Sequence, residues 1–317
     1  MLAAVAPLVF TFGDPAIGES SGMAASTVSD HWVFTHNDSG DGARFFVVDG
    51  SGATVATHTL PGAEAVDWED MASGPDEQGR PSLWFGDIGD NDAVRAEVAV
   101  YRVPEPAVDP GTVGVRVTTP APAHFRLVYE DGPHDAETLL VHPATGRLYV
   151  VTKSYFGVSG VYAAPHPLAA GGENRLQLVA EVEIAPTGTL GGPSRLGSLA
   201  QVTVTGGAVA PGGDRLALRT YTDVHEWVMA DGDVASALAG PPVAVTPLPE
   251  TAQGEAVTYS RDGRSLLTTS EGERAPVHTL PSVVTPVPAP ALLSAVATVA
   301  PTVLAVGAAL GAALAAG

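Results

Sequence analysis

The sequence predicts an all-β protein, and within that class a β-propeller of five blades with four antiparallel strands each. Three observations lead to this prediction. The 317 residues include 36 glycines and 27 prolines, which favours many short elements over long helices. Runs rich in aromatic and β-branched residues alternate with turn residues, as in strands. These runs also recur as a repeated unit, which is typical of a ring of small sheets.

Each repeat opens with a small or acidic residue followed by a short apolar run, which we interpret as the innermost strand of a blade. We place the five openings at Ser21, Glu69, Glu137, Gly207 and Glu255. The second strand of each blade is the strongest signal, because aromatic and β-branched residues dominate it. The five second strands are predicted in HWVFTHND, SLWFGDIGD, RLYVVTKS, RLALRTYTD and RSLLTTSEG. Third strands follow in runs such as RFFVVDG and VAVYRVPEP, and fourth strands in runs such as TVATHTLPG and HFRLVYEDG.

The fifth unit lacks an outer strand, whereas the chain begins with a spare one, PLVFTF. We therefore expect the N-terminal strand to complete the last blade and close the ring. The interval between Glu137 and Gly207 contains TGTLGGPSRLGSLAQ, which leaves room for a further strand pair and a six-bladed ring. A β-sandwich with chance similarity between its strands is the alternative to a propeller.

The ends of the chain differ from its middle. We assign 1–281 to the propeller, 282–290 to a Pro-rich spacer and 291–317 to an apolar, Ala-rich tail. The tail carries no charge and is longer than the roughly 20 residues that cross a bilayer, so it is a candidate transmembrane anchor; a disordered or cleaved tail is the alternative. The start, MLAAVAPLVF, lacks the basic residues of a signal peptide, so either the true start lies upstream or export uses an atypical signal. We expect an extracellular or cell-surface protein, anchored or released.

Charge and composition exclude several function classes. Lys and Arg number 15 against 35 Asp and Glu, so 15 − 35 gives a net charge of −20, which argues against a nucleic-acid partner. The absence of cysteine excludes disulfides, thiolate zinc sites, iron–sulfur clusters and a cysteine nucleophile. No nucleophile elbow, zinc-protease motif, P-loop or dinucleotide fingerprint occurs. We expect a monomer that binds a small-molecule or cell-envelope ligand.

Several phrases resemble those of secreted actinobacterial propeller proteins. They are HNDSGDGARFFVVD, DWEDMA, WFGDIGDN, YRVPEP and GEAVTYSRDGRSLLTTSEG. The last phrase is also similar to the blade signature of esterase-like phytase-type propellers and, more distantly, of the gluconolactonase and strictosidine-synthase group. The resemblance covers roughly residues 15 to 280 and implies the fold; function on propellers ranges from hydrolysis to binding alone.

On a propeller, the start of the first strand and the end of the second meet at one mouth of the central channel. This arrangement brings acidic side chains close together, where their charges repel unless a cation compensates them. A site with oxygen ligands only, in a chain that has no cysteine, favours a hard ion such as Ca²⁺. The candidate metal ligands are Asp38, Glu69, Asp70, Asp87, Asp90 and Glu137. The loops 36–42 and 86–92 resemble calcium loops, although Asp and Asn in them can simply form turns. Glu69 and Asp70 can instead accept hydrogen bonds from backbone amides.

The remaining candidates would contact a ligand or move protons. Lys153, Arg219, Glu255 and Glu271 are predicted at the same mouth as ligand-binding residues. Lys153 is the only lysine of the chain, and its alternative role is an internal counter-ion to Glu137 or Asp87. The catalytic candidates are His36, His134 and Lys153. The two histidines are chosen because an imidazole titrates in the range that a general base needs.

Two functions follow from these candidates. The first is a non-catalytic recognition domain, displayed at the cell envelope, with a calcium site at the channel mouth. The second is a calcium-dependent hydrolase of small esters or phosphoesters, in which a metal polarises substrate or water. The sequence contains no visible nucleophile with a base beside it, which favours the first.

Overall fold

A computed structural model describes residues 6–109 and 111–283, and it is a β-propeller. Antiparallel pairing groups every described strand except one into five units of four, which we call blades 1 to 5.

Blade 1 contains β2 (Ser20–Ala25), β3 (Val33–Asn37), β4 (Arg44–Val48) and β5 (Thr54–Thr59). Blade 2 contains β6 (Trp68–Pro75), β7 (Pro81–Asp87), β8 (Val98–Pro104) and β10 (Ala123–Tyr129). Blade 3 contains β11 (Ala136–Val141), β12 (Leu148–Thr152), β13 (Val158–Ala163) and β14 (Glu173–Glu183). Blade 4 contains β15 (Val204–Val209), β16 (Arg215–Thr220), β17 (Asp223–Val228) and β18 (Ala244–Pro247). Blade 5 contains β19 (Gly254–Tyr259), β20 (Ser265–Ser270), β21 (Pro276–Pro281) and β1 (Leu8–Thr11).

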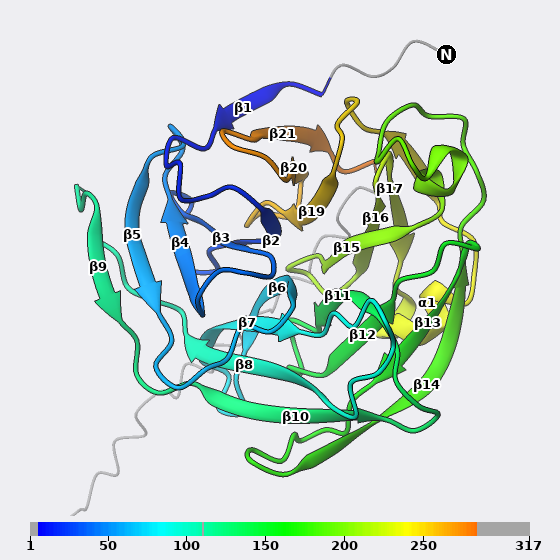
Figure 1. The fold of residues 1–317 in the computed structure, drawn as a ribbon, viewed down its shortest axis with the longest axis horizontal. Helices are drawn as coiled ribbons and strands as arrows, with labels where there is room; N and C mark the ends of the chain where they lie inside the picture. The colour runs from blue at the N-terminus through cyan, green and yellow to red at the C-terminus, as the bar shows by residue number, and fades with distance from the viewer. Residues whose placement is uncertain (1–5, 110, 284–317) are drawn as a thin grey trace, which may run out of the picture. The chain divides into compact units, whose positions relative to one another are not determined.

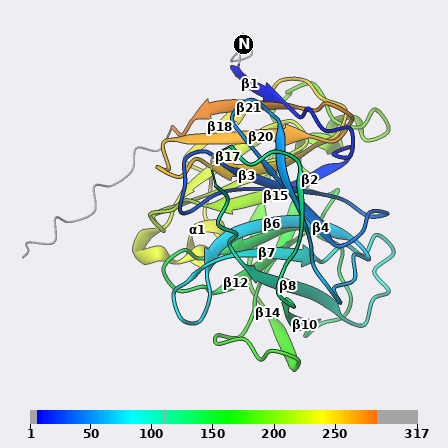
Figure 2. The same cartoon turned by 90° about the vertical axis from the view of Figure 1, so that its left-hand side faces the viewer.

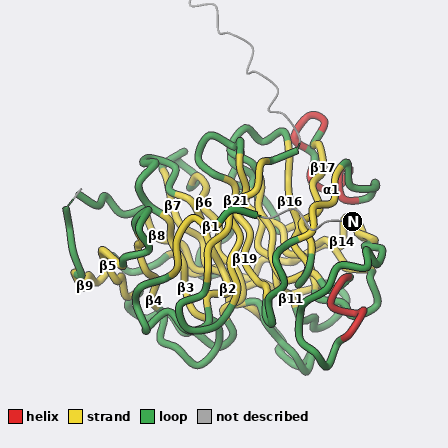
Figure 3. The backbone as a smooth tube through the Cα atoms, turned by 90° about the horizontal axis from the view of Figure 1, so that it is seen from above, coloured by secondary structure: helices red, strands yellow, loops and turns green. Residues whose placement is uncertain are grey.

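The five innermost strands surround a common axis. β2, β6, β11, β15 and β19 each contact the next strand of this series, and β19 contacts β2 (Figure 1). This closed order contradicts the alternative of two stacked sheets. Helices are limited to α1 (Val234–Leu238) and the short 3₁₀ turns Gly197–Gln201 and Ala230–Gly232 among the described residues (Figure 3).

The N-terminal strand closes the ring, as the sequence predicts. β1 pairs antiparallel with β21, so the first and last described strands of the chain share blade 5 (Figure 2). Phe10 and Phe12 of this N-terminal segment are buried in the same apolar cluster as Val277 of β21. Ring closure therefore depends on side-chain packing as well as on backbone hydrogen bonds.

One apolar cluster fills each interface between neighbouring blades. Phe45 of blade 1 and Phe85 of blade 2 are typical, with ring centroids 5.2 Å apart. Trp227 of blade 4 is 1 % exposed and packs against blade 3. Burial of apolar surface on both faces of every blade is what holds the blades in a ring.

Two features of the outer edge were not predicted. β9 (Val115–Thr118) adds a parallel strand to β5 of blade 1. β10 and β14 also pair in parallel, which joins blades 2 and 3 into one eight-stranded sheet. In the interval that left room for a sixth blade, the chain continues β14 to Glu183 and then forms the 3₁₀ turn Gly197–Gln201.

Residues 284–317 lie outside the described residues, and so do residues 1–5. They include most of the predicted spacer 282–290 and all of the predicted tail 291–317, so those assignments stay predictions. Within 6–109 and 111–283, no helix combines the length and apolar character needed to cross a bilayer.

Candidate metal centre

The innermost strand of every blade carries a β-bulge near its start. In each case the pairing register with the second strand shifts across one or two residues. The residues that the register skips are Ser21 with Gly22, Glu69, Glu137, Thr205, and Glu255 with Ala256. A bulge turns a side chain out of the regular alternation of a strand and is common next to functional sites. The five openings predicted from the sequence are these bulges, except that the fourth is Thr205 and not Gly207.

The start of each inner strand lies beside the end of the second strand. The backbone N–H of Asp38 donates to the carbonyl of Glu19 at 2.9 Å, and that of Lys153 donates to the carbonyl of Asp135 at 2.9 Å. In blade 5 the N–H of Glu271 donates to Gln253 in the same way. This pairing brings the side chains after the second strands to the mouth that the bulged residues line.

Two groups of carboxylates meet at this mouth. Asp38, Asp67 and Glu69 form the first group, and Glu69, Asp135 and Glu137 form the second. Within each group, one oxygen of every carboxylate lies within 4.8 Å of the corresponding oxygens of the other two. Glu69 belongs to both, so five carboxylates from blades 1, 2 and 3 form one continuous acidic cluster. We call it the acidic mouth.

Burial makes ionisation of the acidic mouth unfavourable. It raises the pKa of Asp38 and of Asp67 to about 6, and the charges of neighbouring acids add to the effect. It raises the pKa of Glu69 well above the usual range, with the charge of Glu137 as the next cause. The pKa of Glu137 rises to about 7 through burial, although Lys153 opposes the shift. Crowded carboxylates of this kind need a cation or protons.

Lys153 forms an ion pair with Glu137, and their side chains are 9 % and 4 % exposed. Burial is the largest single influence on the pKa of Lys153 and lowers it, but the charge of Glu137, the hydrogen bond to Glu137 and the nearby Tyr221 and Asp135 together raise the pKa above its ordinary value. Lys153 is therefore placed as an internal counter-ion to Glu137, the alternative role given for it in the sequence analysis.

Glu255 and Glu271 extend the acidic mouth toward blade 5. Glu255 is 3 % exposed, and its Oε2 has no hydrogen-bond partner among the described residues. Burial raises the pKa of Glu255 well above the usual range, followed by the charges of Glu137 and Glu271. Glu271 accepts a hydrogen bond from Gln253 Nε2 at 3.0 Å. The buried Arg219 donates to the carbonyls of Ala256 and Thr269, and burial lowers its pKa to about 10.

Three predicted metal ligands lie outside both groups. The carboxylate of Asp70, fully buried, accepts hydrogen bonds from the amides of Met71 at 2.8 Å and Leu139 at 3.0 Å. Asp87 forms an ion pair with Arg95 at 2.9 Å. Asp90 accepts from the amides of Val94 at 3.0 Å and Arg95 at 2.7 Å. These carboxylates bind the protein itself, which for Asp70 is the structural alternative weighed from the sequence.

In the loop that follows β3, most polar side chains form hydrogen bonds and ion pairs with nearby protein groups. Asn37 donates from its side chain to Asp41 at 2.7 Å and accepts from the amides of Gly18 and Glu19 at 3.1 Å. Asp41 in turn pairs with Arg44 at 2.8 Å. Of the acids in this loop, only Asp38 belongs to the acidic mouth.

The two candidate histidines lie apart from the two carboxylate groups. His36 is fully buried, its Nδ1 lies 2.8 Å from the carbonyl of Asn37, and burial lowers its pKa to about 4. His134 Nε2 lies 3.0 Å from Asp131 and 2.9 Å from the Tyr162 hydroxyl. Neither ring belongs to the groups that Glu69 shares.

Asp67 and Asp135 are members of the acidic mouth that the sequence analysis missed. Each stands two residues before the bulged glutamate, in the phrases DWE and DAE. Gln253 has the same place before Glu255, so the repeat itself contains the signal. Gly89 completes the wall: a Cβ at that position would lie 2.2 Å from Glu69 Oε1 and 2.4 Å from Asp67 Oδ2.

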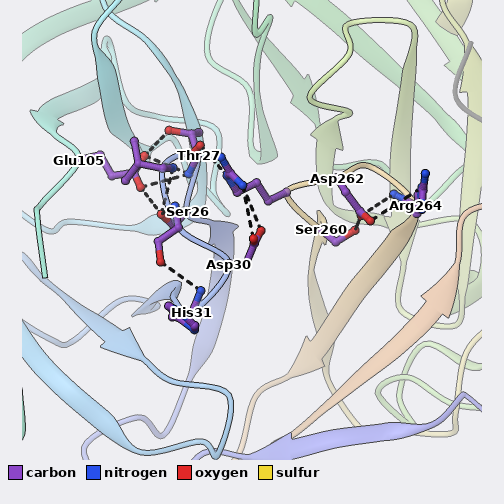
Figure 4. Close-up of polar contacts among 11 residues, drawn as sticks. Ser26, Thr27, Asp30, His31, Glu105, Ser260, Asp262 and Arg264 are labelled. Atoms are coloured by element: carbon purple, nitrogen blue, oxygen red, sulfur yellow. Dashed lines mark hydrogen bonds and ion pairs between the residues drawn. The ribbon is translucent and has the colours of Figure 1, made fainter. Parts of the chain in front are cut away.

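The opposite mouth of the channel has a different character. A cavity of about 320 Å³ lies where the inner strands end, bordered by prolines and hydroxyl side chains that include Ser73, Pro75 and Thr258. At its rim, Glu105 accepts hydrogen bonds from Ser26 and Thr27, and Arg261 donates to the Thr27 carbonyl at 2.9 Å (Figure 4). Neither carboxylate group lies at this end.

No protein-family profile matches this chain, and no curated protein matches it. Among solved structures, a gluconolactonase from Xanthomonas campestris is similar with a TM-score of 0.42 and 17 % identity, over 83 % of this chain and 71 % of that one. A chain of the mitotic checkpoint complex is similar with a TM-score of 0.39 and 13 % identity, over 83 % of this chain and 64 % of that one. Likenesses this distant carry no argument about function.

Proposed function

We propose that this protein is a ligand- or partner-binding β-propeller that holds Ca²⁺ at its acidic mouth. The observation that carries the proposal is the placement of the Asp38, Asp67 and Glu69 carboxylates within 4.8 Å of one another. Ca²⁺ binds oxygens at about 2.3–2.6 Å, so oxygens on opposite sides of one ion are roughly 5 Å apart. The three carboxylates therefore fit around a single ion.

The donor chemistry supports a hard cation. Every side chain in the two groups offers carboxylate oxygens, which Ca²⁺ prefers. Three carboxylates supply three to six of the six to eight oxygens that Ca²⁺ takes, which leaves positions for water or for oxygens of a ligand. We propose that the ligand is a small molecule or a component of the cell envelope that presents hydroxyl, carboxylate or phosphate oxygens.

We further propose that the protein acts outside the cell or at its surface, as a monomer. Extracellular modules bind Ca²⁺ with dissociation constants of about 10⁻⁴–10⁻³ M, and the cost of ionising the buried carboxylates of the acidic mouth would weaken binding toward that range. The apolar tail 291–317 would provide a tether if it is retained.

The test is thermal unfolding of the metal-free chain with and without Ca²⁺. At a free Ca²⁺ concentration about 100 times the dissociation constant, binding adds about 2.7 kcal/mol to the free energy of unfolding. We expect a rise in Tm of roughly 5–10 °C. Glu69→Gln removes the carboxylate that both groups share, so its Tm should not respond to Ca²⁺.

Glu183→Gln is the matched control, because Glu183 is exposed on the outer strand β14. This variant should respond as the wild type does. A wild-type Tm that ignores Ca²⁺, or an equal response in Glu69→Gln, would contradict the proposal.

One observation favours a second candidate, a calcium-dependent hydrolase of small esters or phosphoesters. The pKa of Glu137 is raised to about 7, which suits a group that accepts and returns a proton near neutral pH. Esterase and phosphatase assays with and without chelator test this candidate. Background rates in both conditions would remove it and leave the binding function.

A further inference from the structure

Lys153 contacts the second carboxylate group, whose three side chains lie close enough together to hold a metal ion. Its ammonium pairs with Glu137, one of the three carboxylates of the second group. Among the described residues, no carboxylate of the first group forms an ion pair, and Glu137 is not a member of that group. The two groups are otherwise alike, since each consists of three carboxylates and both contain Glu69.

The charge of Lys153 reaches beyond its ion pair. It favours ionisation of acids in three other blades, namely Asp38, Glu69, Glu255 and Glu271. One of these four acids, Glu255, has an oxygen, Oε2, without a hydrogen-bond partner among the described residues. A single ammonium thus acts electrostatically on acids of blades 1, 2 and 5 as well as on its partner Glu137.

Lysine suits this role better than arginine. An ammonium is a compact point charge, whereas guanidinium is a planar fork that directs hydrogen bonds along fixed lines. Arginine supplies every other fixed cation of the chain, and Lys153 is the only lysine in 317 residues. A like charge already in place also repels a divalent ion that approaches the same carboxylates.

We infer that Lys153 is a built-in cation that fills the second of two adjacent cation positions and thereby limits the acidic mouth to one metal ion. This inference rests on the proposed function, because it requires a metal at the first group. It gives Lys153 a role in setting the number of bound metal ions, beyond the ligand-binding, catalytic and counter-ion roles considered from the sequence.

The test is the number of Ca²⁺ ions bound per full-length chain, measured by calorimetric titration of metal-free protein. We expect one ion for the wild type, one for Lys153→Arg, which keeps the charge, and two for Lys153→Gln. The double variant Lys153→Gln with Glu137→Gln breaks the second group again and should return to one ion.

Lys153→Gln leaves Glu137 buried without its partner, so it is also purified in Ca²⁺ and its bound metal counted by elemental analysis. No bound ion in the wild type would overturn the proposed function together with this inference. One ion in both the wild type and Lys153→Gln would overturn the inference alone. Two ions in the wild type would also overturn it, whatever the variants do.

Discussion

Glu69, Glu137 and Glu255 are buried acids on the innermost strands, and their burial determines how they respond to protons and metal. Glu69 and Glu137 lie in one acidic cluster with Asp38. Lys153 forms an ion pair with Glu137, as expected for the counter-ion role considered from the sequence. The sequence allowed these placements to be predicted because the openings of the repeat and the ends of the second strands stand at fixed places in each unit.

Asp70, Asp87 and Asp90 show where prediction at the residue scale stops. Their carboxylates bind backbone amides or Arg95. Aspartate caps amides in turns and also ligates Ca²⁺, and the residue type is the same in both roles. Only the position of the neighbouring N–H groups decides between them, and the sequence does not contain that position.

The raised pKa values predict how stability depends on pH. Asp38 and Asp67 have folded pKa values of about 6 and Glu137 of about 7, above the values expected in the unfolded chain. Each of these acids binds more protons in the folded state than in the unfolded state, so its contribution to the free energy of unfolding falls as pH rises toward its folded pKa. The buried rings of His36 and His225, whose pKa values are lowered to about 4, act in the opposite direction below the ordinary histidine pKa of about 6.5. The metal-free Tm should therefore decrease between about pH 6.5 and pH 8, where these histidines no longer titrate and the acids with raised pKa values still do.

Saturating Ca²⁺ should remove most of this decrease, because the bound carboxylates are ionised throughout that range. Thermal melts across the pH range, in chelator and in Ca²⁺, provide the measurement. A metal-free Tm that stays level or rises toward pH 8 would show that the acids of the mouth are not crowded as described.

At the scale of elements, the β-bulge is what turns a repeated strand into a repeated site. Four of the five bulges coincide with openings read from the sequence, whereas Thr205 was missed because the glycines that follow it resemble the start of an apolar run. The strand β9 and the parallel pairing of β10 with β14 had no local signal, since the partners lie in other parts of the chain.

Gly22 tests the bulge of β2 directly. A Cβ at this position would lie 2.3 Å from His36 Nε2 and 2.6 Å from the backbone nitrogen of Met71. His36 is fully buried, so its ring has no free space to move into. We expect Gly22→Ala to reduce the free energy of unfolding by about 1–3 kcal/mol through overpacking.

Gly50→Ala is the control for that variant, because a Cβ there would have no atom of another described residue within 4 Å apart from its two chain neighbours. Denaturant unfolding of both variants, with Tm as a second readout, makes the comparison. Equal stability of the two variants would mean that β2 and β6 are not in contact at this bulge.

At the scale of the whole molecule, the ring gives the two ends of the channel different chemistry. Inner strands that start at one mouth and end at the other place the acids of the repeat together at the first and a proline-lined cavity at the second. Closure by β1 and one apolar cluster per interface hold this arrangement. The repeat made the ring predictable from sequence, whereas the cavity depends on the loops between blades and was not predicted.

The central claim is that distant acids share one cation at the acidic mouth. The most direct measurement is a crystal structure of the chain grown with Ca²⁺ or Mn²⁺, with the metal located by anomalous scattering. We predict one strong peak at bonding distance, about 2.3–2.6 Å for Ca²⁺, from the carboxylates of Asp38, Asp67 and Glu69. A crystal in saturating metal with no peak there, or with these three carboxylates too far apart to share an ion, would contradict the account.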